Sequence, residues 1–280
     1  MRITLFGTRG SIAAPGPETN RYGGNTSTVE VLGKDGTMLV LDAGTGIRRL
    51  AATISPTTAR VDILLTHLHM DHIQGLGFFG PLYDPKIDVH IWGPASSELT
   101  LEARLSRYLS PPLFPVHLRH LPSVVCHEVP RPPFDIGPFR IRTSLVCHPG
   151  PTVGYRIEAQ EGVAAYLSDH EPALGLLNGR WPAPDWISGY DLAVNADLLI
   201  HDAQYTDDEY QHRIGWGHST YRHAFEFASQ VGAKQIVPFH HDPSHDDDML
   251  DHLLDLAIKS SKSTCAVVAG REGTVFDIGA

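Results

Sequence analysis

The stretch Thr66–His72, which reads T-H-L-H-M-D-H, is the part of the sequence that most restricts the fold and the kind of site. Three histidines and one aspartate fall within the six residues from His67 to His72. They directly follow Val61–Leu65, an apolar run typical of a buried strand. Histidine is the commonest metal ligand in proteins. A single tetrahedral zinc ion cannot easily use four ligands so crowded, so the stretch predicts two adjacent metal ions.

A two-metal site needs more ligands, and suitable side chains appear downstream. His148, Asp169 and His240 each stand at the end of a predicted strand. Strand ends are where rigid scaffolds present reactive groups. Each of the three residues alone would be interpreted as a surface or capping residue. Beside the first cluster, each is predicted to be a metal ligand.

The remaining sequence predicts an α/β protein in which helices cover sheets. Helices are predicted over Ile47–Thr53, Ser96–Leu109, Thr220–Val231 with Ser219 as N-cap, and Asp246–Lys259. The predicted strands are Arg2–Phe6, Thr26–Leu32, Thr37–Leu41, Val61–Leu65, Ile87–Trp92, Val124–Val129, Phe139–Val146, Val153–Ala159, Val163–Ser168, Asp197–Ile200, Lys234–Phe239, Thr264–Val268 and Thr274–Ile278.

Length and composition restrict the class of protein. The chain has 280 residues and no linker long enough to divide it, so we expect residues 1–280 to form one metallo-hydrolase domain. No apolar run reaches 18 residues, which argues against a membrane-spanning helix. The start, MRITLFGTRGS, does not read as a signal peptide. Only three cysteines occur and none forms a CxxC pair, which favours a cytoplasmic location. The net charge of 22 − 32 = −10 argues against a general nucleic-acid binder.

The pattern HxHxDH, followed by a separate His, Asp and His, resembles the metallo-β-lactamase superfamily. The resemblance covers nearly the whole chain, from the Asp42-Ala43-Gly44 turn to the last predicted ligand. It implies a four-layer αβ/βα sandwich with the site at one edge of the paired sheets. It also implies two divalent metal ions, bridged by Asp169 and a hydroxide. By this resemblance one ion is held by His67, His69 and His148, and the other by Asp71, His72 and His240.

Within the superfamily, the chain is similar to the phosphodiesterase branch, which includes tRNA 3′-processing endonucleases and small cyclic-phosphate phosphodiesterases. A histidine just before a helix marks that branch, and Gly217-His218-Ser219-Thr220 matches it, 22 residues before His240. The start of a helix attracts anions, so a phosphate can lie nearby. The resemblance implies that His218 is the general acid for the leaving oxygen and that Asp71 also orients the hydroxide.

One departure from the tRNA-processing enzymes bears on the substrate. Those enzymes carry a long tRNA-clamping insertion between the third-motif histidine and the bridging aspartate, whereas His148 and Asp169 are 21 residues apart. With the acidic net charge, this spacing disfavours a large RNA substrate. We predict a phosphodiesterase for a small or cyclic anionic phosphodiester. A ribonuclease, a thioester or lactone hydrolase with the same metal centre, and a non-hydrolytic sensor stay open as alternatives.

Several further expectations concern the surroundings of the site. Zinc suits histidine and carboxylate ligands, but manganese or iron can occupy such sites. The resemblance also implies a homodimer. We expect no association with a membrane. Asp42 is expected either to orient a metal ligand or to cap a turn, and His170 and His241 are expected beside ligands or in solvent. The remaining candidates are His212, His223 and His245 at the surface, and Arg9, Arg21 and Arg213 as substrate contacts.

Overall fold

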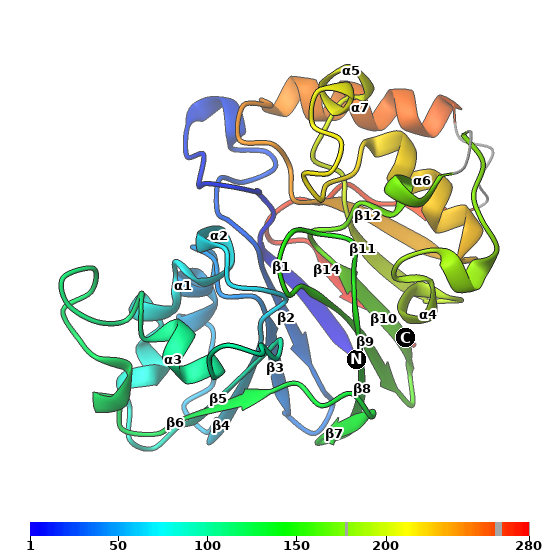
Figure 1. Cartoon of the computed structure of the whole chain (residues 1–280). Helices are drawn as coiled ribbons and strands as arrows, with labels where there is room; N and C mark the ends of the chain where they lie inside the picture. The colour runs from blue at the N-terminus through cyan, green and yellow to red at the C-terminus, as the bar shows by residue number, and fades with distance from the viewer. Residues whose placement is uncertain (177–178, 261–264, 280) are drawn as a thin grey trace.

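The computed structural model describes residues 1–176, 179–260 and 265–279, and within them the strands form two seven-stranded sheets (Figure 1). The first sheet has the order β14 (Val275–Asp277), β1 (Arg2–Gly7), β2 (Thr28–Leu32), β3 (Met38–Leu41), β4 (Arg60–Leu64), β5 (Asp88–Gly93) and β6 (Val124–Glu128). The second has the order β13 (Ala266–Val267), β12 (Gln235–Phe239), β11 (Leu198–Asp202), β10 (Gly162–Leu167), β9 (Val153–Ala159), β8 (Phe139–Leu145) and β7 (Phe134–Ile136).

Helices cover the outer face of each sheet, on opposite sides of the molecule (Figure 1). The first sheet is covered by α1 (Ile47–Ala51), α2 (Met70–Ile73) and α3 (Leu101–Leu105). The second is covered by α4 (Tyr190–Ala193), α6 (Tyr221–Gln230) and α7 (Asp247–Ser260), with α5 (Asp207–Gln211) nearby. Short 3-10 helices are η1 (Pro17–Thr19), η2 (Leu76–Phe78), η3 (Gly80–Tyr83), η4 (Leu118–His120), η5 (Pro172–Gly175) and η6 (Pro184–Trp186). The four-layer αβ/βα sandwich is therefore confirmed.

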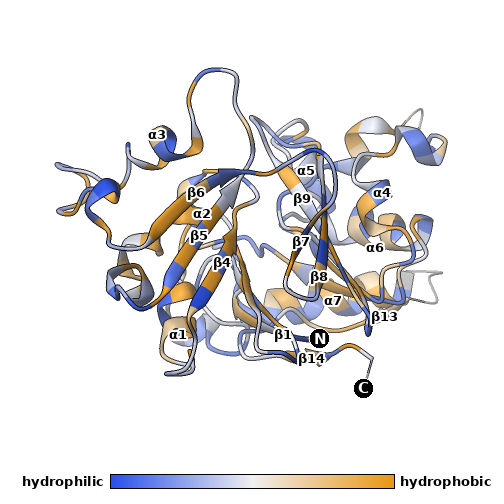
Figure 2. Cartoon of the chain, turned by 90° about the horizontal axis from the view of Figure 1, so that it is seen from below, coloured by the Kyte–Doolittle hydropathy of each residue, from blue (hydrophilic) through white to orange (hydrophobic). Residues whose placement is uncertain are grey.

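The main core lies between the two sheets. Leu5 and Leu39 of the first sheet and Tyr155 and Tyr166 of the second are buried in one hydrophobic cluster. Figure 2 shows the hydrophobic residues concentrated on the strands and the hydrophilic ones on loops and outer helix faces. Strand β11 is buried along its whole length because its two faces meet the other sheet and the helices.

Sheet topology brings the loops that follow several strands to one edge. Strands β3 to β6 run parallel to one another, and so do β10 to β13. Carboxyl ends of parallel strands meet at the same edge of a sheet, where ligand sites of α/β proteins form. The loops after β4, β10, β11 and β12 carry the candidate site, and the connection after antiparallel β8 adds to it.

Some predicted elements differ from the observed ones. The predicted helix Ser96–Leu109 is only Leu101–Leu105. It begins after Thr100, whose side chain accepts a hydrogen bond from Ala103 N, and it ends at Leu105 with Ser106 as its C-cap. Helix α6 is capped by Thr220, whose side chain accepts from His223 N, and not by Ser219, whose hydroxyl donates to His170 O. Strand β7 was not predicted. The predicted strand Thr264–Val268 begins outside the described residues.

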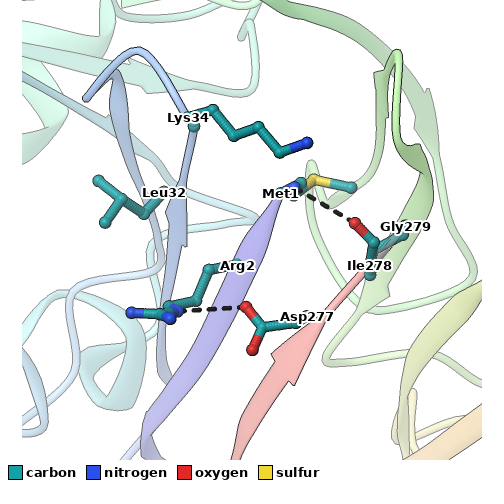
Figure 3. A pocket seen from close by; sticks show the side chains of 8 residues that line it. Met1, Arg2, Leu32, Lys34, Asp277, Ile278 and Gly279 are labelled. Carbon is teal, nitrogen blue, oxygen red and sulfur yellow. Dashed lines mark hydrogen bonds and ion pairs between the residues drawn. The ribbon is translucent and has the colours of Figure 1, made fainter.

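The two ends of the chain lie side by side, where β1 pairs with β14 (Figure 3). The Met1 ammonium donates to the Ile278 carbonyl at 3.3 Å, and Arg2 donates to Asp277 at 3.2 Å. A pocket of about 300 Å³ lies beside them, and none of its lining residues is a predicted metal ligand. No described helix combines the length and apolar character needed to cross a membrane.

Candidate metal centre

The segment after β4 changes direction within a few residues, and this turn separates the crowded ligands. His67 lies just past the strand, and His69 is the N-cap of α2 in an extended conformation. Asp71 and His72 lie on α2 itself and are buried. A strand end followed directly by a helical turn therefore lets one short segment present ligands to two neighbouring points.

All seven predicted ligands come together in the structure. One group contains His67, His69, His148 and Asp169, and a second contains Asp71, His72 and His240, with the ligand atoms of each group within 4.8 Å of one another. Asp169 lies between the groups: its carboxylate oxygens are 3.7 Å from His67 Nε2, 3.0 Å from His72 Nε2 and 3.4 Å from His240 Nε2. This is the geometry expected of a residue shared by two ions.

Hydrogen bonds on the far side of the rings fix which histidine nitrogens face the cluster. His72 Nδ1 lies 2.8 Å from Asp42 Oδ2, His148 Nδ1 lies 3.0 Å from the Gly217 carbonyl, and His240 Nδ1 lies 3.0 Å from Gln204 Oε1. These oxygens act as acceptors, so Nδ1 of each ring carries the hydrogen and donates. Each Nε2 therefore presents a lone pair to the cluster, as in metal-binding histidines generally.

Inside the cluster, imidazole nitrogens face one another. His72 Nε2 and His240 Nε2 are 3.3 Å apart, as are His148 Nε2 and His69 Nδ1. His67 Nε2 and Asp169 Oδ1 are buried without a hydrogen-bond partner among the described atoms. Converging, unpartnered lone pairs in a buried site are costly unless a cation neutralises them. The donor set fits divalent metal ions.

The protonation states also favour metal binding. Burial, followed by the charge on His72, lowers the pKa of His67 well below its ordinary value. Burial alone would raise the pKa of Asp169, but His240, His72 and His67 hold that pKa well below its ordinary value. His67 and Asp169 thus offer neutral imidazole and an ionised carboxylate, the forms that bind metals. Burial alone would lower the pKa of His72, but Asp169, Asp71 and Asp42 raise it well above its ordinary value, so that ring releases a proton when a metal ion binds.

Metal removal should therefore destabilise the fold. A ligand present at about 1,000 times its dissociation constant stabilises the folded state by about 4 kcal/mol. For a chain of this size, each kcal/mol shifts Tm by about 2–4 °C. We expect chelated protein to melt roughly 10 °C below protein reloaded with Zn²⁺. Differential scanning calorimetry checks this, and equal Tm values for the chelated and reloaded protein would contradict it.

Asp42 contacts the predicted ligand His72, which favours the orienting role over the turn-capping one. It also accepts hydrogen bonds from Thr66 N at 2.7 Å and from the Tyr166 hydroxyl at 2.9 Å. We expect Asp42→Asn to weaken metal binding by about 10- to 100-fold, as loss of such supporting bonds does elsewhere. Competition with a chromogenic chelator measures this. Asp62→Asn is the matched control, since Asp62 is equally buried but accepts hydrogen bonds from Arg60 and Trp92. Equal losses of metal affinity in the two variants would refute the orienting role.

His218 lies against the cluster with a partner that sequence reasoning missed. Its Nδ1 is 2.7 Å from Asp202 Oδ2, and its ring stacks on that of His240 at a centroid distance of 5.1 Å. Asp202 is fully buried at the end of β11 and also accepts from Ser219 N at 2.7 Å. Burial lowers the pKa of His218 and raises the pKa of Asp202. The position of Asp202 at a strand end, as for Asp169, is the sequence pattern that could have revealed it.

A buried chain of neutral groups runs behind the ligands. His201 Nδ1 donates to the Asp202 carbonyl at 2.7 Å, so its Nε2 accepts from His170 Nδ1 at 2.9 Å. His170 Nε2 then accepts from the Ser188 hydroxyl at 3.1 Å, and that hydroxyl accepts from Cys147 N at 2.8 Å. Burial lowers the pKa of His170 well below its ordinary value, and it lowers the pKa of His201 to about 4. The chain links residues adjacent to His148, Asp169 and the partner of His218.

Several expectations about the surroundings are wrong. Arg9 is fully buried, so it is not exposed to a substrate. Its side chain donates to the carbonyls of Gly23, Asp242 and His245 and thereby holds the segment after β1 in place. His223 and His245 are buried, not superficial, since α6 packs on the sheet and His245 meets Glu209. His241 is buried and lies close to the Gly270 carbonyl, and Arg21 pairs with Asp248 and Asp251. His212 is exposed, as expected.

Comparison with known proteins places the chain. A family model described as the beta-lactamase superfamily domain matches residues 37–241. The chain belongs to the metallo-β-lactamase superfamily. Curated relatives of this superfamily protein include ribonuclease Z of Natronomonas pharaonis, 25% identical over 86% of both chains, and ribonuclease Z of Myxococcus xanthus, 26% identical over 89% of both.

Solved structures show the same fold. The metallo-β-lactamase fold protein YhfI from Bacillus subtilis has a TM-score of 0.70 at 19% identity and covers 98% of both chains. The short form of human tRNase Z has a TM-score of 0.67 at 23% identity and covers 99% of both. A diphosphatase of the PhnP family gives 0.68 at 18% identity, covering 99% of this chain and 97% of that one. The predicted superfamily is confirmed. The prediction that the protein is a hydrolase is confirmed as well, since the homologues are hydrolases of this superfamily.

Proposed function

We propose that this superfamily member is a two-metal phosphodiesterase for a small or cyclic phosphodiester, working as a single domain over residues 1–280. The observation that carries the proposal is His218, oriented by Asp202 and stacked against His240 at the edge of the cluster. Thioester hydrolysis at the same cluster gives such a residue no evident role, because a thiolate leaves without a proton. Cleavage of a phosphodiester does, because its leaving oxygen needs a proton.

The metal ligands are assigned from two of the three candidate groups; in the third, Asp169, His218 and His240, His218 is assigned to proton transfer. His67, His69 and His148 would hold one ion, Asp71, His72 and His240 the other, and Asp169 both. Zinc suits these ligands, with manganese and iron as alternatives. When bound, the ions would neutralise nonbridging phosphate oxygens and lower the pKa of a water molecule.

The chain's own residues then have distinct tasks. Burial raises the pKa of Asp202 and lowers that of His218, so Asp202 keeps a proton that it donates to His218 Nδ1, and the neutral ring carries its hydrogen on Nε2. Nε2 would give that proton to the leaving oxygen. Asp202 holds the ring in that orientation. Asp71 accepts a hydrogen bond from Ser11 N at 2.7 Å, which fixes its carboxylate beside His240 and leaves it able to orient the attacking water.

Two observations favour a small substrate. The segment between His148 and Asp169 consists mainly of β9 and β10, which pair as an antiparallel hairpin with Gly162 opposite Ala159. No room is left there for an RNA-clamping arm. The net charge of −10 also gives a polyanion little general attraction. A homodimer and a cytoplasmic location stay predictions.

A ribonuclease is the second candidate, and the curated relatives named ribonuclease Z favour it. Three classes of substrate separate the alternatives: cyclic nucleotides, a tRNA precursor with a 3′ extension, and thioesters or lactones. We expect the metal-loaded protein to hydrolyse the cyclic nucleotides with the highest kcat/KM. Faster cleavage of the tRNA precursor would favour the ribonuclease, and turnover of thioesters or lactones alone would refute both phosphodiesterase readings.

A further inference from the structure

We infer that exposed apolar side chains around the metal centre, the apolar rim, select phosphodiesters that carry an aromatic or similarly flat apolar substituent. The rim consists of Ile12, Met70, Ile214 and Trp216. The inference rests on the proposed function and goes beyond it by naming the group next to the phosphate. The four side chains lie on segments whose backbone contains or contacts candidate ligands.

Two rim residues lie just past strands of the first sheet, Ile12 on the loop after β1 and Met70 at the start of α2. Met70 is 51% exposed although it stands between the candidate ligands His69 and Asp71. Ile12 is 60% exposed and follows Ser11, whose backbone N–H donates to Asp71 Oδ2. Ser11 itself has a φ of 60°, an uncommon conformation for a residue other than glycine, and such conformations gather at functional sites.

The other two rim residues lie on the loop before α6. Ile214 and Trp216 are each 59% exposed. Gly217, next to Trp216, accepts the hydrogen bond from His148 Nδ1, and a Cβ on Gly217 would lie 2.2 Å from that nitrogen. The backbone beside Trp216 is thus in direct contact with a candidate ligand, and the indole lies two residues before His218.

A buried carboxylate holds this loop in one shape. Glu171 is fully buried and accepts from Gly215 N at 2.9 Å, Gly217 N at 2.7 Å and the Tyr210 hydroxyl at 2.7 Å. The loop therefore presents Trp216 on a fixed backbone, although the indole is exposed. Preorganised aromatic side chains bind partners at a low entropic cost.

The charge of the same loops limits the substrate. The segments 10–14, 66–73 and 210–217 contain one Lys or Arg between them, Arg213. Its guanidinium lies 4.9 Å from the centre of the Tyr205 ring, and that ring lies 5.6 Å from the His218 ring. A long nucleic acid needs a track of cations, whereas one cation with apolar neighbours suits a single phosphate that carries apolar groups.

The test compares substrates that share a leaving group and differ in the group left behind. Bis(p-nitrophenyl) phosphate keeps an aryl group after cleavage, and methyl p-nitrophenyl phosphate keeps a methyl group. We expect Trp216→Ala to lower kcat/KM for the diaryl ester about tenfold, through KM, since stacking on one aromatic side chain contributes about that much. The methyl ester should change less than about twofold, and Trp216→Phe should restore most of the loss.

Binding supplies a readout that needs no turnover. Calorimetric titration of the metal-loaded protein should show that diphenyl phosphate binds about tenfold more weakly to Trp216→Ala than to the wild type, with dimethyl phosphate unchanged. Trp186→Ala is the matched control, because Trp186 is also exposed and no described contact joins it to the cluster. It should leave both ligands unaffected.

The outcomes separate the two proposals. Equal effects of Trp216→Ala on the aryl and alkyl ligands, or no effect on either, would overturn the rim while leaving phosphodiester hydrolysis intact. A changed oligomeric state with an unchanged aryl preference would overturn it as well. Selective loss of diphenyl phosphate binding in a protein that hydrolyses no phosphodiester would support the rim and refute the proposed function.

Discussion

We expect Asp169→Asn to lower hydrolysis of bis(p-nitrophenyl) phosphate by on the order of a thousandfold, since metal ions contribute several kcal/mol to such reactions and each 1.36 kcal/mol is tenfold in rate. Asp169 lies within reach of both ligand groups, with oxygens 3.0 Å from His72 Nε2 and 3.8 Å from His148 Nε2. Asparagine keeps the shape and removes the negative charge. Metal content should fall together with the rate.

Asp247→Asn is the matched control for this substitution. Asp247, the first residue of α7, is similarly buried, but its carboxylate accepts hydrogen bonds from the backbone N–H groups of Arg21 and Tyr22. We expect the control to lose stability while keeping its metal and its rate per folded molecule. A fully active Asp169→Asn protein with unchanged metal content, measured by plasma emission spectrometry, would contradict the shared-ligand assignment.

His218→Ala should reduce kcat by about 10²- to 10⁴-fold, the usual contribution of a general acid, with KM changed far less. Metal content should stay the same, because His218 is assigned to proton transfer. The loss should be larger for an alkyl leaving group than for p-nitrophenolate, which departs readily without a proton. That dependence on the leaving group is the readout that a purely structural role of His218 would not produce.

Asp202→Asn tests the same step through its partner. The hydrogen bond at 2.7 Å to His218 Nδ1 is then weakened, and the loss of kcat should follow the same dependence on leaving group at smaller magnitude. A His218→Ala protein that loses activity equally with good and poor leaving groups, or that loses its metal, would refute the general-acid assignment.

The sequence was most informative where function is local. The stretch Thr66–His72 concentrates ligands directly after a buried strand, and the later ligands stand at strand ends, so the cluster could be predicted before any contact was known. Apart from β7, the described strands of both sheets were also predicted to within a few residues, because apolar, β-branched runs bounded by glycine and polar residues mark them clearly.

What could not be predicted depends on contacts between distant segments. Asp202 and His218 are 16 residues apart, and Asp42 and His72 are 30 apart, so no local pattern pairs them. The burial of His223 and Arg9 depends likewise on which helix face or loop meets the sheets. The predicted helix Ser96–Leu109 failed for a local reason, since the Thr100 cap outweighed the apolar pattern.

The central claim is that two metal ions held by this cluster support phosphodiester hydrolysis. The most direct test titrates chelated protein with Zn²⁺ or Mn²⁺ while following hydrolysis of bis(p-nitrophenyl) phosphate, with His69→Ala as the inactive reference. We predict that the rate rises until two ions are bound per chain and that His69→Ala stays inactive throughout. Two bound ions without turnover, or turnover that persists after chelation, would contradict the account.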